Sequence, residues 1–175
     1  MAKTAKINVR PAAPDDALAI GDAHAEAWRV GYETLFDPDV LAQEVASRRV
    51  GWADRMAARG MEHTTLLVGE VDGVVRGFAH VGPAADTSAG EVYGFYAHPA
   101  AWGQGLAQAM MVEGLASLEG MGFNTACVWT LRDAGRARAF YEKAGFGPSG
   151  ATRQEAFGEQ VMVLVEYVRR IGTAT

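Results

Sequence analysis

The spacing of apolar and polar residues divides the chain into a helical first third and a mixed remainder of strands and helices. Residues 7–10 alternate between apolar and polar side chains, which predicts a short strand. Pro14 suits the first position of a helix, and apolar side chains then recur as far as Trp28. Residues 37–59 are typical of a second helical stretch, with a break expected at Gly51.

Strand-like segments begin in the middle of the chain. The runs 64–71 and 74–81 are rich in β-forming residues and are separated only by Asp72 and Gly73. An Asp-Gly pair between two such runs is a strong signal for a tight hairpin, so these two strands should be antiparallel. A loop of small residues follows, and residues 91–97 form a third predicted strand.

Helices and strands alternate in the last part of the chain. Residues 103–118 carry apolar side chains at helical spacing, and residues 124–131 return to a strand pattern. Residues 134–144 predict another helix, which Gly145 is well suited to end, and residues 161–168 predict a last strand. The strands on either side of the first of these helices form a β-α-β crossover, which makes them parallel neighbours. A mixed α/β sheet with helices on both faces follows.

Composition narrows the class of protein. The 175 residues suit one domain spanning residues 1–175, and 49% of them are hydrophobic. The net charge of -5 disfavours nucleic acid as a partner, because such binders usually carry a basic surface. The single cysteine, Cys127, excludes an internal disulfide and lies in an apolar run that predicts a small core residue. No signal-like start or membrane-length apolar run is present, so we expect a cytoplasmic protein without a membrane partner.

The segment 98–107 has the composition of an anion-binding turn. A strand ends at a proline, and Gly103 and Gly105 then lead directly into a helix. Glycines allow close backbone approach, and the first N–H groups of a helix have no internal acceptor, so a pyrophosphate would fit here. A tight turn without a ligand is the alternative. A dinucleotide fingerprint is disfavoured, because it needs Gly or Ala where this chain has Gln108 and because an antiparallel hairpin precedes it.

Two segments together resemble one known family. Residues 102–107 read Trp-Gly-Gln-Gly-Leu-Ala and resemble the Arg/Gln-x-x-Gly-x-Gly/Ala turn of GNAT-type N-acetyltransferases, with Trp102 in place of Arg or Gln. Residues 140–146 resemble the Phe-Tyr-x-Lys-x-Gly-Phe helix end of the same family. Ala134 stands where relatives often carry an Asn that contacts the pantetheine arm.

The resemblance implies a fold and a reaction. The fold would be a mixed, largely antiparallel sheet with one central parallel strand pair and helices on both faces. The coenzyme A core would cover about residues 64–168, and helices at about residues 14–60 would form the acceptor side. The reaction would move an acetyl group from acetyl-CoA to a primary amine by direct attack in a ternary complex. A non-catalytic acyl-CoA-binding or sensing module of the same fold is the alternative.

The resemblance also implies catalytic residues. Tyr141 would donate a proton or hydrogen bond to the sulfur that leaves, unless it is only an aromatic core residue. Glu91 would take the proton of the amine through water, with a solvated carboxylate or a water-only route as alternatives. A bulge in the strand before the turn would present backbone N–H groups around residues 96–98. Strand alternation places Glu91, Tyr93 and Phe95 on one face and Val92, Gly94 and Tyr96 on the other.

Binding residues follow from the same comparison. The expected coenzyme contacts are Tyr96, Ala97, His98, Trp102, Gly103, Gln104, Gly105, Leu106, Ala107, Ala134, Phe140 and Lys143. The expected acceptor contacts are the aromatic residues Trp28, Tyr32 and Tyr93, which suit an amine cation.

Several other polar residues have open roles. His24 and His80 either contact the acceptor or serve in the structure, and Arg136 and Arg138 either reach phosphates or remain solvated. The four histidines show no metal-ligand spacing, so no metal site is expected. The acceptor, a small molecule or a peptide amine, has no sequence code, and a homodimer is left open.

Overall fold

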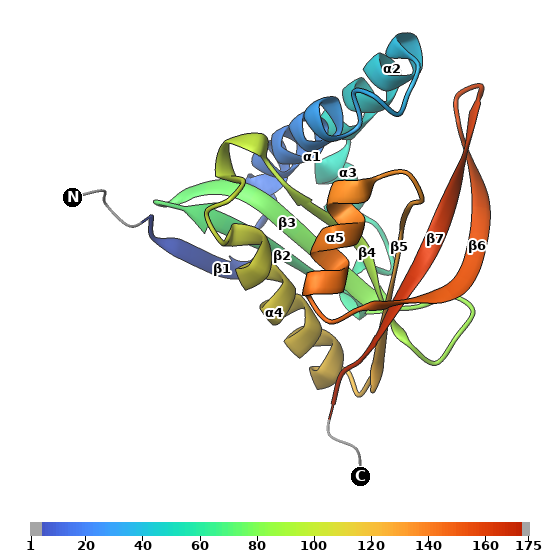
Figure 1. Cartoon of the computed structure of the whole chain (residues 1–175). Coiled ribbons are helices and arrows are strands. Elements are labelled where there is room, and N and C mark those ends of the chain that lie inside the picture. The colour runs from blue at the N-terminus through green and yellow to red at the C-terminus, as the bar shows by residue number, and fades with distance from the viewer. Residues whose placement is uncertain (1–4, 173–175) are drawn as a thin grey trace.

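A seven-stranded sheet with helices packed on it is the framework of the computed structural model, which describes residues 5–172 (Figure 1). The strands are β1 (Ile7–Pro11), β2 (Thr65–Val71), β3 (Val74–Pro83), β4 (Gly90–Ala97), β5 (Thr125–Leu131), β6 (Gly147–Phe157) and β7 (Gln160–Arg170). The α-helices are α1 (Ala17–Gly31), α2 (Pro38–Arg49), α3 (Trp52–Ala57), α4 (Leu106–Gly120) and α5 (Gly135–Lys143). Three short 3₁₀ helices are η1 (Pro14–Asp16), η2 (Met61–His63) and η3 (Pro99–Ala101).

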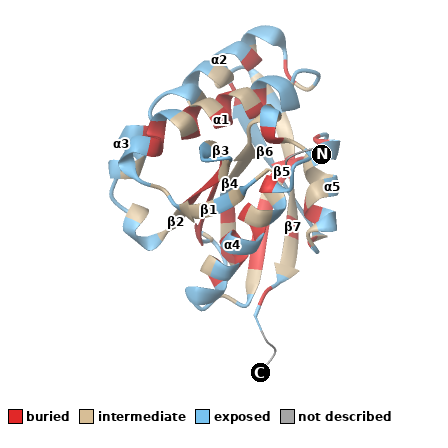
Figure 2. Cartoon of the chain, turned by 90° about the vertical axis from the view of Figure 1, so that its left-hand side faces the viewer, coloured by how far each residue is buried: buried red, intermediate tan, exposed pale blue. Residues whose placement is uncertain are grey.

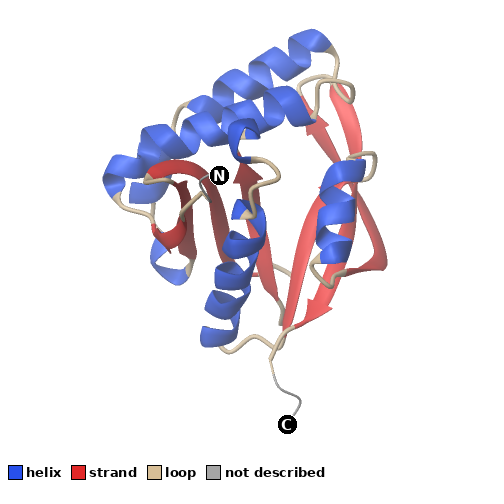
Figure 3. Cartoon of the chain, turned by 60° about the vertical axis from the view of Figure 1, so that its left-hand side comes forward, coloured by secondary structure: helices blue, strands red, loops and turns tan. Residues whose placement is uncertain are grey.

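The strand order confirms the mixed fold that the sequence predicts. The strands lie side by side in the order β1-β2-β3-β4-β5-β7-β6. The pair β4–β5 is parallel, and the other neighbouring pairs are antiparallel. The parallel pair holds over only three residue pairs, from Gly90–Ala126 to Val92–Val128, although both strands continue beyond it. The two strands therefore diverge in the middle of the sheet (Figure 3).

The predicted hairpin and helix break are confirmed. Asp72 and Gly73 both have positive φ, 50° and 80°, which is the backbone that a two-residue type I′ turn requires. Gly51 has a φ of 82° and separates α2 from α3. The predicted helix at 103–118 begins three residues later, at Leu106, because residues 102–105 form a turn.

Both faces of the sheet are covered by helices, as predicted. On one face α1 and α3 bury Ile20 and Trp52 against Val68 and Phe78. On the other face α4 packs Leu106 and Met110 against Leu67 and Ala79. Neighbouring residues of one strand, such as Leu67 and Val68, therefore lie on opposite faces of the sheet, as the alternation of a strand dictates. Buried positions accordingly lie along the strands and on the sides of α1 and α4 that face them (Figure 2). Cys127 is buried in the sheet, as expected.

The sequence pattern missed one strand, β6. Nine of its 11 residues are exposed, and of the whole strand only Phe157, at its end, is buried. An edge strand with both faces in solvent has no apolar alternation to reveal it. It pairs along one edge with β7, and this hairpin extends past the end of α5 (Figure 1).

Candidate functional site

A cleft of about 1080 Å³ opens where β4 and β5 diverge. Its walls come from the end of α1, the start of α4, α5 and the β6–β7 hairpin. It gathers most of the residues that the sequence assigns to the site: Trp28, Tyr32, Glu91, Tyr93, Tyr96, Ala97, Trp102, Gly103, Gly105, Leu106, Ala107, Ala134, Phe140, Tyr141 and Lys143. Residues that are far apart in the sequence thus meet in one cavity.

The glycine-rich turn presents free backbone donors at one end of this cleft. Gly103 and Gly105 have φ values of 76° and 87°, a conformation that side chains disfavour. A Cβ atom built on Gly103 would meet nothing within 4 Å, so the backbone there is open. Within the described chain, the N–H groups of residues 103–108 donate to no backbone acceptor. With the dipole of α4 behind them, these N–H groups form an anion site.

A bulge in β4 changes which side chains share a face. His80 pairs with Gly94, but the next β3 residue, Val81, pairs with Val92, so Tyr93 is an extra residue. Val92 and Phe95 consequently both pack on the core against α4. The prediction that Phe95 lies with Glu91 and Tyr93, opposite Val92, is wrong for this reason.

The side chains on the other face of β4 point toward α1. The Tyr93 ring lies 5.1 Å from the ring of His80, and the Tyr96 ring lies 4.5 Å from that of His24. The Tyr93 hydroxyl donates to the carbonyl of Pro83, so it is already engaged. The bulge thus turns Tyr93 and Tyr96 to the face that α1 covers.

The backbone of β4 has free groups beyond the bulge. In an antiparallel ladder alternate residues direct their N–H and C=O groups to the partner strand, and the others face away. Past Val92 the strand has no partner on its β5 side, so those outward groups face the cleft. His98 is not among them, because its N–H donates to the carbonyl of Arg76 at 2.7 Å.

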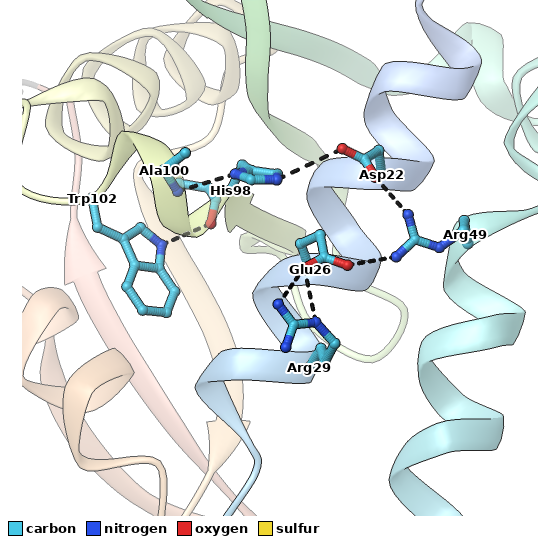
Figure 4. A network of polar contacts seen from close by, with 8 residues as sticks. Asp22, Glu26, Arg29, Arg49, His98, Ala100 and Trp102 are labelled. Atoms are coloured by element: carbon cyan, nitrogen blue, oxygen red, sulfur yellow. Dashed lines mark hydrogen bonds and ion pairs between the residues drawn. The ribbon is translucent and has the colours of Figure 1, made fainter.

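His98 and Gln104 are two predicted contacts that the structure places outside the cleft lining. The His98 ring accepts a hydrogen bond from the N–H of Ala100 through Nδ1, and its Nε2 lies 3.7 Å from the carboxylate of Asp22 on α1 (Figure 4). Gln104 donates to the carbonyl of Ala100 at 2.8 Å. Both side chains therefore hold the turn in shape instead of facing a ligand.

Tyr141 is a buried phenol that lines the cleft. The residue is 6% exposed, and its ring packs among Phe140, Phe146 and Tyr167. Burial raises the pKa of its hydroxyl well above the ordinary value, and the nearby phenol of Tyr96 adds to the shift. The hydroxyl therefore stays protonated at neutral pH and is available as a donor.

Two further phenols converge on Tyr141. Burial, together with the proximity of Tyr96 and Tyr141, raises the pKa of Tyr32 well above its usual value. Tyr32 follows α1, Tyr96 belongs to β4 and Tyr141 to α5. No local pattern in the sequence indicates this convergence, because it depends on how three separate elements pack.

Glu91 is a half-buried carboxylate on β4. Burial raises its pKa, the nearby Arg153 lowers it, and Glu166 and Asp86 raise it further. The net shift is upward, so this carboxyl group exchanges a proton closer to neutral pH than an exposed glutamate does.

The far end of the cleft contains aromatic rings and two arginines. The rings of Trp28 and Tyr32 meet edge to face at 4.7 Å. The guanidinium of Arg48, whose side chain is 15% exposed, lies 3.3 Å from the centre of the Trp28 ring. Arg153 and Phe157 come from β6. No sequence motif indicates Arg48, Arg153 or Phe157; the last two belong to β6, a strand without an apolar pattern.

The two candidate arginines of α5 differ. Arg136 lines the cleft and stacks on Trp102, with 3.4 Å between its guanidinium carbon and the ring centre. Arg138 instead donates to the Tyr167 hydroxyl and to the carbonyl of Arg132, both at 2.9 Å. Arg138 therefore serves the structure of α5.

The remaining histidines lie outside the cleft lining. Burial lowers the pKa of His24 to about 3, and its ring packs against Trp52, Phe78 and Tyr96. His80 shares a 2.9 Å hydrogen bond with the hydroxyl of Thr64, and burial lowers its pKa. Among residues 5–172, no three His, Cys, Asp or Glu side chains are grouped to hold a metal ion. No helix in that range is long and apolar enough to cross a membrane.

Comparison with known proteins gives one family. The family model described as "Acetyltransferase (GNAT) family" matches residues 21–146. The mycothiol acetyltransferase of Streptomyces coelicolor is 36% identical over 93 residues, which cover 53% of this chain. The match spans only 30% of that relative's length.

Solved structures share the fold at low sequence identity. The PaiA N-acetyltransferase of Thermoplasma acidophilum, in complex with coenzyme A, superposes with a TM-score of 0.74 at 13% identity, covering 94% of this chain and 99% of its own. An acetyltransferase-type protein, YncA, from Salmonella typhimurium, solved with its cofactor acetyl-CoA, gives 0.69 at 18% identity, covering 96% of this chain and 95% of its own.

Proposed function

The chain belongs to the GNAT acetyltransferase family, and we propose that it transfers an acetyl group from acetyl-CoA to a primary amine by direct attack within a ternary complex. The observation that carries the proposal is the divergence of β4 and β5, which opens a cleft that the buried residue Tyr141 lines. The cleft has an anion-binding turn at one end and an aromatic wall at the other. A donor and an acceptor can therefore enter from opposite ends and meet at Tyr141.

The residues present fit the coenzyme. The free N–H groups of residues 103–107 would hold its diphosphate, as they need no side chain to do so. Ala134, Phe140 and Lys143 line the same cleft, and would flank the pantetheine arm. The outward backbone groups of β4 would pair with that arm as a neighbouring strand does. When bound, acetyl-CoA supplies an acetyl group that is activated as a thioester.

Tyr141 is proposed as the proton donor. Its raised pKa keeps the hydroxyl protonated, and the residue lines the cleft, where its hydroxyl would face the reacting atoms. It would donate its proton or a hydrogen bond to the sulfur as the bond to the acetyl carbon breaks.

Glu91 is proposed as the proton acceptor for the attacking amine. An amine that enters as an ammonium ion must lose a proton before it can attack, and a carboxylate with a raised pKa accepts one more readily than an exposed carboxylate does. Glu91 lines the cleft on the same strand as Tyr93 and Tyr96, and would act through water.

The backbone of β4 is proposed to polarise the carbonyl. An outward N–H past the bulge would donate to the acetyl oxygen, where negative charge develops during attack. Donors fixed in a sheet need no reorganisation at the moment of reaction, so their contribution is large.

The helices at residues 14–60 are proposed as the acceptor wall, and residues 64–168 as the coenzyme core. Trp28 and Tyr32 line the acceptor end from α1 and the residues just after it, with Tyr93 from β4. The face of an aromatic ring attracts a cationic amine before it loses its proton. The identity of the acceptor rests on this end of the cleft.

The test is a steady-state assay of thiol release from acetyl-CoA with a panel of primary amines, checked by the mass of the acetylated product. We expect Tyr141→Phe to lower kcat by about 10²- to 10⁴-fold with unchanged acetyl-CoA affinity. Tyr167→Phe is the matched control, because Tyr167 is buried beside Tyr141 but its hydroxyl bonds Glu142 and Arg138. This control should lose stability and keep kcat.

Two results would contradict the proposal. Equal kcat for wild type and Tyr141→Phe would remove Tyr141 from the role of acid. Tight acetyl-CoA binding without turnover of any amine would favour the alternative, a module that binds acyl-CoA without catalysis.

A further inference from the structure

Trp102 is fixed at the phosphate end of the cleft. It directly follows η3, and its indole Nε1–H donates to the carbonyl of Ala97 at the end of β4, at 2.8 Å (Figure 4). The hydrogen bond holds the ring edge, while the ring itself lines the cleft. The indole is thus a rigid surface beside the free N–H groups of the glycine-rich turn.

Arg136 reaches this surface from the opposite wall. It lies in the first turn of α5, and its guanidinium carbon is 3.4 Å from the centre of the Trp102 ring. Such a short separation is typical of a stacked cation–π pair. The pair therefore links the turn before α4 to the start of α5 across the cleft.

The guanidinium of Arg136 has unused donors. Among the described residues it forms no salt bridge and no side-chain hydrogen bond, in contrast to Arg138 two positions along. Stacking occupies the face of the guanidinium and leaves its N–H edge free, and that edge matches the oxygens of a phosphate group. Arg136 is exposed as a whole residue, and the partial burial of its guanidinium against Trp102 lowers its pKa.

We propose that Arg136 binds a phosphate group of the coenzyme through its free N–H edge, and that Trp102 is the residue that positions it. The inference rests on the proposed function, since it assigns the ligand of that same cleft. It also explains how a chain with Trp at position 102, where the family pattern has Arg or Gln, supplies a cation to the turn. The cation comes from across the cleft instead of from the turn itself.

Lys143 and Arg169 also line the cleft, and so does Asp133, whose carboxylate pairs with Arg132. Of the three cations only Arg136 stacks on Trp102. The contribution of Arg136 is therefore separable by substitution.

The test is calorimetric binding of three probes to the whole protein: coenzyme A, dephospho-coenzyme A and S-acetylpantetheine, which carries no phosphate. We expect Arg136→Ala to weaken coenzyme A binding by roughly 10- to 100-fold, as for a charge-assisted hydrogen bond, and to leave S-acetylpantetheine binding unchanged. A loss that persists with dephospho-coenzyme A assigns Arg136 to the diphosphate, and a loss confined to coenzyme A assigns it to the 3′-phosphate. Both support the proposal.

Three variants that change Trp102, together with one charge control, separate positioning from folding. Trp102→Leu should weaken coenzyme A binding, Trp102→Phe should restore part of it, and Trp102→Leu combined with Arg136→Ala should lose less than the two single effects multiplied. Arg132→Ala removes the same charge from a side chain that does not line the cleft, and should bind coenzyme A as wild type does.

The inference is wrong if Arg136→Ala binds coenzyme A as tightly as wild type does. It is also wrong if Arg136→Ala loses S-acetylpantetheine to the same degree, because the effect would then be structural. Failure of wild type to bind any of the three probes would contradict the proposed function itself, which is a distinguishable result.

Discussion

Gly21→Ala should destabilise the protein because α1 and α2 touch through their backbones at this position. A Cβ atom on Gly21 would lie 2.2 Å from the carbonyl oxygen of Arg49 and 3.0 Å from its carbonyl carbon. Both are main-chain atoms of α2, so the helix itself must move. We expect the free energy of unfolding to fall by about 2 kcal/mol. Overpacking costs about 3 kcal/mol, and the higher helix propensity of Ala offsets up to about 1 kcal/mol of this cost.

The matched control is Gly31→Ala at the end of the same helix, where a Cβ atom would meet nothing within 4 Å. Thermal unfolding should show Gly21→Ala lower in Tm by about 4–8 °C, and Gly31→Ala equal to wild type or slightly higher. Equal stability of Gly21→Ala and wild type would refute the backbone contact between α1 and α2.

The same substitution also tests which wall serves the acceptor. α2 carries Arg48, which lines the aromatic end of the cleft. Gly21→Ala should therefore raise the KM for the amine while acetyl-CoA affinity changes little. An equal change in both would show that the displaced helix affects the whole cleft.

Two predictions concern pH. Glu91 has a raised pKa and must be deprotonated to accept a proton, so kcat/KM should fall as pH drops through that pKa. Glu91→Gln should be slower, and its pH–rate profile should lack this fall at acidic pH. An unshifted profile would remove Glu91 as the base. His24 has a pKa of about 3 when folded. The unfolded chain binds this proton from about pH 6.5 downward, so stability should decline below that pH, by about 2 kcal/mol at about pH 5. Urea unfolding should show this decline reduced in His24→Leu, and an equal decline in both proteins would contradict it.

Local residue chemistry predicts much of the fold. Asp72-Gly73 predicts the hairpin because positive φ at both positions is what its turn needs. Gly51 predicts the helix break for the same reason. β6 was missed because a solvated edge strand has no apolar face, and Phe95 was placed on the wrong face because a bulge inserts Tyr93.

Residues of the site can be predicted from the sequence only where they belong to a recognisable motif. The turn at residues 102–107 and the helix end with Tyr141 are visible in the sequence, and both line the cleft. The approach of Tyr32 to Tyr141 and the stack of Arg136 on Trp102 are not visible, since each joins elements whose packing no local pattern records.

The most direct test of the central claim is thermal unfolding with and without saturating acetyl-CoA, with NADH as the control ligand. At a hundredfold excess over Kd, a bound ligand stabilises by about 2.7 kcal/mol, which corresponds to about 5–10 °C in Tm for a chain of this size. We expect that shift with acetyl-CoA and none with NADH. An unchanged Tm at high acetyl-CoA would contradict a coenzyme site between β4 and β5.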